Sequence, residues 1–211
     1  MQKIRLKYAK TGKAMYISHL DLMAVMQRAL IRAGIELKYS EGFNPHPYMS
    51  VALPLSVGNE STCELIDVAV MDDELPDIKS IKLPEGIEVL DAYKPVRKFN
   101  EISWVEIIGS MHYGAQINAA LTDELKKCYS KQNIVVSKRT KRGSKDLDLA
   151  PFIKDICINI DDIITLNAKI SAQNPTINAD DLLNALDDGS KPEYMIIKRI
   201  DIYDTNMIIF R

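Results

Sequence analysis

This sequence of 211 residues lacks the features that define several large protein classes. It has three cysteines and no C-x-x-C step, so a disulfide framework, a zinc ribbon and an iron–sulfur cluster held by this chain alone are all unexpected. No apolar run approaches the ~20 residues that cross a bilayer, and the N-terminal residues do not form the apolar segment of a signal peptide. We therefore expect a cytoplasmic protein without membrane contact.

Common catalytic signatures are also missing. The sequence contains no P-loop, no G-x-G-x-x-G, no G-x-S-x-G and no H-E-x-x-H. We assign no metal site and expect this chain to bind no cofactor. These absences favour a protein that is not catalytic on its own.

The charged residues that are present are strongly segregated, although the formal net charge is only −2. Residues 1–40 hold eight Lys or Arg against two acidic residues, and residues 126–145 hold eight more with none. Residues 146–188, by contrast, hold nine Asp and two Lys. Such a chain can present basic surfaces to a polyanion such as RNA, although solvated charged faces are the simpler alternative.

Hydrophobic periodicity predicts the same order of elements in both halves of the chain. In the first half, apolar and basic residues alternate over residues 3–9, which is typical of a strand, and Ser18 caps a helix over 19–33 that stops at Gly34. The remaining elements of this half are strands at 48–55, 62–71 and 87–94 and a short helix at 73–80.

The second half is expected to contain strands at 102–111, 133–140, 164–172 and 196–203, with helices at 115–130 and 179–187, the latter capped by Asn178. Two β-α-β-β-α-β orders in tandem predict an α+β protein built from two ferredoxin-like units. We place the domains at residues 1–97 and 98–211, joined by a linker near 93–100.

The most informative block is residues 16–61, which contain the run SHLD at 18–21 and the loop GFNPHP at 42–47. Gly42 permits a positive φ, and Pro45 and Pro47 force extended conformations on the residues before them. Asn44 can bond its side chain to nearby backbone. A stiff, non-repetitive loop with this composition favours a role in recognition.

In these motifs the chain resembles the radical SAM-linked proteins, a bacterial family of unknown function whose members occur alone or fused C-terminal to cobalamin-binding-type radical S-adenosylmethionine (SAM) proteins. The resemblance is weaker beyond the block and extends to about residue 200. It implies a radical SAM enzyme as partner. Because the chain lacks the C-x-x-x-C-x-x-C triplet that holds a radical SAM cluster, it would be the non-catalytic subunit. The matching residues are 18–21, 27–29, 32–33, 39–40, 42–47, 52–55 and 58–61.

Two arginines on the first helix are candidates for binding an anion. Arg28 and Arg32 lie one turn apart on the same stripe as Asp21, and a phosphate or carboxylate suits their planar donors. We expect them to line one pocket with His46 and the GFNPHP loop, with His19 at its edge. The alternative is an internal carboxylate that neutralises them.

Candidate catalytic residues are His19, Asp21 and His46, if the helix start meets the GFNPHP loop. The blander alternative is a neutral His19 imidazole bonded to loop backbone, because the start of a helix disfavours a cation.

Aromatic rings near the loop could stack on a base. Tyr39 and Phe43 are the candidates within the loop, and Tyr48 follows it. For Phe43 we favour packing into the hydrophobic core, which is the common place for phenylalanine.

A second basic segment, residues 138–145, enters a loop where several cations can surround phosphates. Its candidate ligands are Lys138, Arg139, Lys141, Arg142 and Lys145. The alternative is a solvent-exposed hairpin tip.

Three functions remain open. The leading hypothesis is an accessory protein that binds RNA, or another anionic substrate, for a separately encoded radical SAM enzyme. The alternatives are an RNA-processing or other enzyme that uses His19 and His46, and a protein–protein adaptor without nucleic-acid binding.

Overall fold

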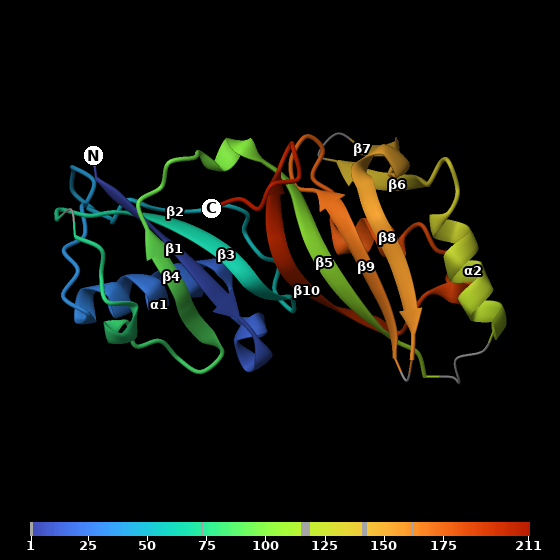
Figure 1. Ribbon diagram of the computed structural model, residues 1–211, viewed down its shortest axis with the longest axis horizontal. Helices are drawn as coiled ribbons and strands as arrows, with labels where there is room; N and C mark the ends of the chain where they lie inside the picture. The colour runs from blue at the N-terminus through green and yellow to red at the C-terminus, as the bar shows by residue number, and fades with distance from the viewer. Residues whose placement is uncertain (1, 73, 115–118, 141–142, 162) are drawn as a thin grey trace. The chain divides into compact units, whose positions relative to one another are not determined.

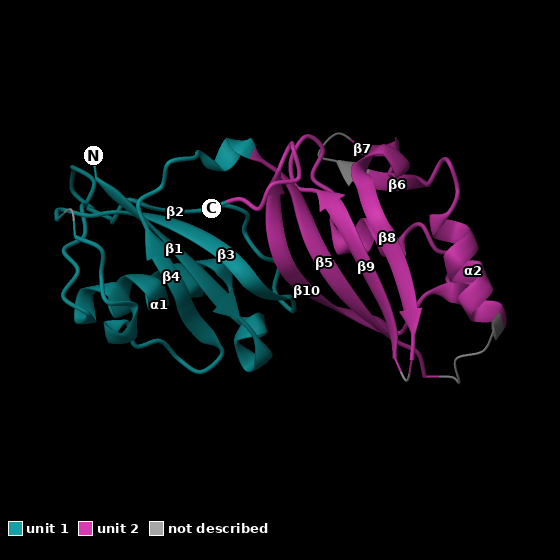
Figure 2. Cartoon of the chain, viewed as in Figure 1, with its two compact units in different colours: residues 1–101, 211 teal, residues 102–210 magenta. Residues whose placement is uncertain are grey.

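The computed structural model describes residues 2–72, 74–114, 119–140, 143–161 and 163–211. The chain forms two compact units, residues 1–101 together with Arg211 (unit 1) and residues 102–210 (unit 2), as Figure 2 shows. The boundary therefore falls four residues after the one placed from the sequence.

Unit 1 is an antiparallel sheet with one long helix on one face (Figure 1). The strands lie in the order β4-β1-β3-β2, and α1 (His19–Arg32) connects β1 to β2. Its strands are β1 (Lys3–Lys10), β2 (Met49–Val51), β3 (Glu60–Ala69) and β4 (Ile87–Tyr93). Its 3₁₀ turns are η1 (Gly12–Tyr16), η2 (Ile78–Ser80) and η3 (Phe99–Glu101).

The core of unit 1 follows from two periodicities. Every second residue of β1 points at the helix, and residues of α1 spaced by three or four pack against these strand residues. Ile4 and Leu6 of the strand and Met26 and Leu30 of the helix are almost completely buried in this layer.

Local signals fix both ends of α1 as the sequence predicts. The Ser18 hydroxyl oxygen accepts a hydrogen bond from the Asp21 backbone N–H at 3.2 Å, which satisfies an unpaired donor of the first turn. At the other end, Gly34 has φ +80° and its N–H donates to the Ile31 carbonyl, while the Ile35 N–H donates to the Leu30 carbonyl. These two bonds form a Schellman motif.

In unit 2, four strands pair antiparallel in the order β10-β5-β9-β8, and β6 and β7 form a separate two-stranded ribbon. Its strands are β5 (Ile102–His112), β6 (Val135–Thr140), β7 (Gly143–Asp148), β8 (Ile153–Ile160), β9 (Ile164–Ser171) and β10 (Tyr194–Asp204). Its helices are α2 (Ala119–Tyr129), α3 (Ala179–Leu183) and the 3₁₀ turns η4 (Ala150–Phe152) and η5 (Asp188–Ser190).

Several predicted elements need correction. The short helix expected at 73–80 is, among the described residues, only the three-residue turn η2. The strand expected at 133–140 forms, but it pairs with β7 in the ribbon, and the sheet position beside β9 belongs to β8, which was not predicted. The helix expected at 179–187 ends at Leu183.

The protein is therefore a mixed α/β protein in which antiparallel strands dominate and the described residues form three α-helices. The described residues do not show two full β-α-β-β-α-β repeats, because within them unit 1 has a single α-helix and unit 2 has six strands. Across the described part of the chain, no helix is both long and apolar enough to span a membrane.

Candidate functional site

The GFNPHP loop of unit 1 is closed at its base by backbone hydrogen bonds. The Lys38 N–H donates to the Ala69 carbonyl at 2.9 Å, the Ala69 N–H donates to Tyr48, and the Tyr48 N–H donates back to Lys38 at 3.0 Å. Tyr39 and Pro47 form an isolated antiparallel bridge just above these bonds. The loop is thus anchored to the end of β3.

Inside the loop, Ser40 and His46 make a second closure. The Ser40 N–H donates to the His46 carbonyl at 2.9 Å, and the His46 N–H donates to the Ser40 hydroxyl oxygen at 3.1 Å. His46 Nδ1 lies 3.2 Å from that hydroxyl oxygen and 3.3 Å from the Asn44 carbonyl oxygen. Together with Gly42, whose φ is +122°, these bonds give the loop a defined shape.

Phe43 lies at the tip of this loop and its side chain is fully exposed, with a relative accessibility of 112%. The expectation that Phe43 packs into the core is therefore wrong. Tyr39 and Tyr48, at the base of the loop, are 38% and 42% exposed. Three aromatic side chains are therefore accessible to a ligand.

Ser40 is the residue of this site that sequence reasoning missed. In the sequence it stands out only within the matching residues 39–40, although it bonds His46 through both backbone and side chain. A hydroxyl residue placed just before a Gly- and Pro-containing loop, with a histidine just before the last proline, is the signal that could have identified it.

The candidate catalytic residues occupy separate local networks. The Asp21 carboxylate accepts a hydrogen bond from the Ser18 hydroxyl at 2.7 Å, at the start of α1, and His19 is exposed there. Among the residues that the structure describes, His46 bonds to Ser40 and Asn44. In the ranges that the structure describes, no three His, Cys, Asp or Glu side chains form a group that could hold a metal ion.

Arg28 and Arg32 are both exposed on α1. Arg32 Nη2 donates to the Lys82 carbonyl oxygen at 3.1 Å. Within the described residues neither arginine forms an ion pair, so the internal carboxylate considered above is not seen there. Both side chains remain candidate anion ligands.

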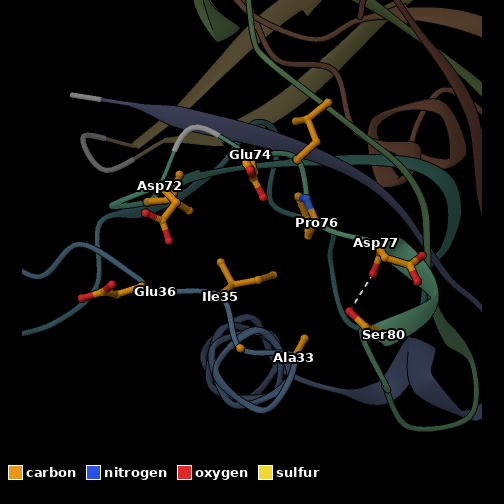
Figure 3. Close-up of a pocket in the computed structure, with 11 residues that line it drawn as sticks. Ala33, Ile35, Glu36, Asp72, Glu74, Pro76, Asp77 and Ser80 are labelled. Carbon is orange, nitrogen blue, oxygen red and sulfur yellow. Dashed lines mark hydrogen bonds between the residues drawn. The ribbon is translucent and has the colours of Figure 1, made fainter.

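A pocket of about 260 Å³ lies beyond the C-terminal end of α1 (Figure 3). Four acidic side chains contribute to its wall, which makes it unsuited to an anion, and neither arginine nor His46 lines it. The pocket predicted to be lined by the two arginines and His46 is therefore not this one, and it stays a prediction. The lining residues are Ala33, Gly34, Ile35, Glu36, Val70, Asp72, Glu74, Leu75, Pro76, Asp77 and Ser80.

In the basic segment of unit 2, one cation is already neutralised. Lys138 Nζ lies 2.6 Å from Asp181 Oδ2 and donates to the Thr176 carbonyl at 2.6 Å. The same carboxylate oxygen accepts the Asn178 N–H at 2.8 Å at the start of α3. Lys138 therefore anchors β6 to α3, and a free phosphate ligand is not expected at this position.

The other predicted cations of this segment are less constrained. Lys145 is exposed and lies opposite Lys138 in the ribbon register. Residues Lys141 and Arg142 and the side chain of Arg139 lie outside the described part of the structure. Their assignment as phosphate ligands stays a prediction.

The fold and the loop together define a mixed α/β protein that carries a hydrogen-bonded loop with exposed aromatic side chains. Residues 3–179 match a family described as "Uncharacterized protein conserved in bacteria (DUF2344)", and the chain belongs to this family. No curated protein matches the sequence.

Proposed function

We propose that this chain is an accessory protein that binds RNA, or another anionic substrate, for a separately encoded radical SAM enzyme. The observation that carries the proposal is the fully exposed Phe43 ring on a loop closed by the Ser40–His46 bonds. When a flat partner covers an apolar ring that a fixed loop exposes to water, the free energy falls because apolar surface is removed from water. Proteins that bind single-stranded nucleic acids stack bases on such rings.

The exposed basic side chains support an anionic ligand. Lys38, at the base of the loop, is exposed, as are Arg28 on α1 and Lys145 on the ribbon. The basic residues are concentrated in the same two parts of the chain, residues 1–40 and 126–145. Contacts between such cations and phosphates supply most of the salt-dependent affinity for a nucleic acid.

The order of the strands supports an interpretation of both units as ferredoxin-like. Counted within each unit, with β8 as the second strand of unit 2, the paired strands of both units have the order 4-1-3-2. In this interpretation the β6–β7 ribbon is an insertion, and η2 replaces the second helix of unit 1. Four-stranded sheets of this kind are common RNA-binding modules.

The radical SAM enzyme enters the proposal only through the resemblance at residues 18–21 and 42–47. We do not propose catalysis by this chain, because among the described residues Asp21 bonds to Ser18 while His46 bonds to Ser40 and Asn44, so the candidates do not share one network.

The test is binding of a fluorescein-labelled single-stranded RNA of mixed sequence, measured by fluorescence anisotropy. Replacing one stacking ring with alanine typically costs about 1–3 kcal/mol, so Phe43→Ala should weaken binding at least about fivefold. Val96→Ala is the matched control, because Val96 is also an exposed apolar residue of unit 1 (94%). No binding by the unmodified chain, or equal losses in both variants, would refute the proposal.

A protein–protein adaptor is the second candidate, and one observation favours it. Leu20, in the SHLD run, is 79% exposed and leaves an apolar side chain on the surface of α1. An adaptor would bind the radical SAM enzyme equally well at high salt, after nuclease treatment and with the Phe43→Ala variant. Loss of the complex under any of these conditions would favour the RNA-binding proposal.

A further inference from the structure

Helix α1 has apolar side chains on its outer side as well as on the side that packs against the sheet. Leu20, Ala24, Gln27 and Ile31 are spaced by four, three and four residues and therefore form one line, here called the outer stripe. Leu20 is 79% exposed and Ile31 is 49% exposed. A helix that only covers a sheet carries polar residues on this side.

Charged residues run beside the outer stripe along one flank. Asp21 lies at the N-terminal end of this flank, and Arg28 and Arg32 lie toward its C-terminal end. All three are exposed, and neither arginine has a carboxylate partner among the described residues. The flank is thus negative at one end and positive at the other.

This pattern is complementary to itself in one orientation. When two identical helices pair antiparallel, each flank faces the same flank of the other helix in the reverse direction. Asp21 of each copy then lies near Arg28 and Arg32 of the other, and the two contacts are related by the twofold axis. A parallel pair would instead place the two charged flanks on opposite sides of the interface, where they could not contact each other.

We propose that α1 pairs antiparallel with α1 of a second copy of this chain through the outer stripe. Leu20 of one copy packs over Ile31 of the other, and Ala24 and Gln27 lie at the centre. The small Ala24 side chain allows the helix axes to approach to the usual 8–10 Å. The inference does not rest on RNA binding, for which Arg28 is also a candidate ligand.

The size of the surface predicts a weak complex. A helix of 14 residues is about 21 Å long. One pair of such helices covers less than the roughly 800 Å² per partner of a standard stable interface. We therefore expect a reversible dimer that dissociates on dilution.

The first test is sedimentation equilibrium of the nuclease-treated full chain from roughly 1 to 200 μM, a range suited to a small interface. The unmodified chain should shift from monomer toward dimer over this range. Leu20→Glu should weaken association at least tenfold, because it places a like charge in each half of the interface. Val96→Glu, at an exposed apolar residue off the helix, should have no effect. Far-UV circular dichroism verifies that each variant is folded.

Charge reversal gives the decisive second test. Asp21→Arg makes the flank wholly basic, and the double variant Arg28→Asp, Arg32→Asp makes it wholly acidic, so each alone should be monomeric. Mixed in equal amounts, the two chains should form a heterodimer. Three outcomes would each overturn the proposal: the unmodified chain is monomeric, the dimer tolerates Leu20→Glu, or the mixture stays monomeric. Either of the last two would mean that the outer stripe binds a different partner or none.

Discussion

Arg5 and Asp67 face each other on neighbouring strands β1 and β3 and form a bidentate ion pair inside unit 1. Arg5 Nε lies 2.6 Å from Asp67 Oδ1, and Nη2 lies 3.0 Å from Oδ2. The guanidinium also stacks 4.2 Å from the centre of the Phe99 ring, and Nη2 donates to the Arg97 carbonyl at 2.9 Å. A fully buried arginine thus ties the segment after β4 to the sheet.

Arg5→Met should strongly destabilise unit 1. Removing one partner of a buried ion pair leaves an uncompensated charge and typically costs about 3–5 kcal/mol. Lys3→Met is the control, because Lys3 lies on the same strand two residues earlier and is exposed, so its replacement should change stability by less than about 0.5 kcal/mol. Urea unfolding followed by far-UV circular dichroism measures both. The fluorescence of Trp104, the only tryptophan and part of unit 2, should change less than the dichroism. Equal stability of the two variants would contradict the prediction.

Gly86 and Gly58 share the same backbone φ of +86° but differ in the space around them. A Cβ at Gly86 would lie 2.3 Å from the Thr11 carbonyl oxygen, whereas no described atom lies within 4 Å of a Cβ at Gly58. Gly58→Ala should therefore cost about 1–2 kcal/mol, the strain of a left-handed alanine. Gly86→Ala should cost about 1–3 kcal/mol more, because its methyl group forces the segment that follows β1 and the turn before β4 apart. Thermal unfolding of the two variants side by side measures the difference, and similar losses would show that the Thr11 contact relaxes freely.

Tyr113 makes the stability of unit 2 sensitive to alkaline pH. Its hydroxyl donates to the Ser190 carbonyl at 3.0 Å, and burial raises the pKa of Tyr113 to about 12. An unfolded tyrosine has a pKa of about 10, so the folded state holds this proton more tightly. The resulting stabilisation is complete below about pH 10 and is lost as the pH rises toward 12.

Tyr113→Phe should accordingly flatten the decline of stability at high pH. The urea midpoint of the unmodified chain should fall more steeply than that of the variant between about pH 9.5 and 11.5. Tyr129, whose pKa is also raised by burial, is retained in both proteins, so the difference between the curves belongs to Tyr113. Parallel curves would mean that the Tyr113 phenol does not titrate in this range.

Structural features that depend on residues close together in the chain could be predicted from the sequence. The alternation in β1, the Ser18 cap and the Gly34 stop are all local, and they predict β1 and α1 almost to the residue. The stiffness of the GFNPHP loop follows in the same way from its glycine and prolines. These signals act before any tertiary contact exists.

Features that depend on distant partners could not be predicted. Arg5 looks like the solvent side of a half-buried strand, and its partner Asp67 is 62 residues away. Lys138 looks like one cation among five, but Asp181, 43 residues later, neutralises it. Phenylalanine is common in hydrophobic cores, but the closed loop leaves the Phe43 side chain exposed to water.

The cations of the basic segment of unit 2 that are not paired with Asp181 give a quantitative prediction. Each phosphate contact on a single strand contributes about 0.7 to the slope of log affinity against log salt. Changing Arg139, Lys141 and Arg142 together to alanine should therefore lower this slope by about 2. The measurement is RNA anisotropy between about 50 and 200 mM KCl.

Lys138 supplies the control within the same segment. Its ammonium group is paired with Asp181, so it does not exchange a counterion for a phosphate. The double variant Lys138→Met, Asp181→Asn removes both charges together, which avoids leaving the buried carboxylate alone, and it should leave the slope unchanged. A slope that falls as much in this variant as in the triple variant would mean that binding depends on the position of the ribbon. An unchanged slope in the triple variant would exclude these three cations from the RNA-binding surface.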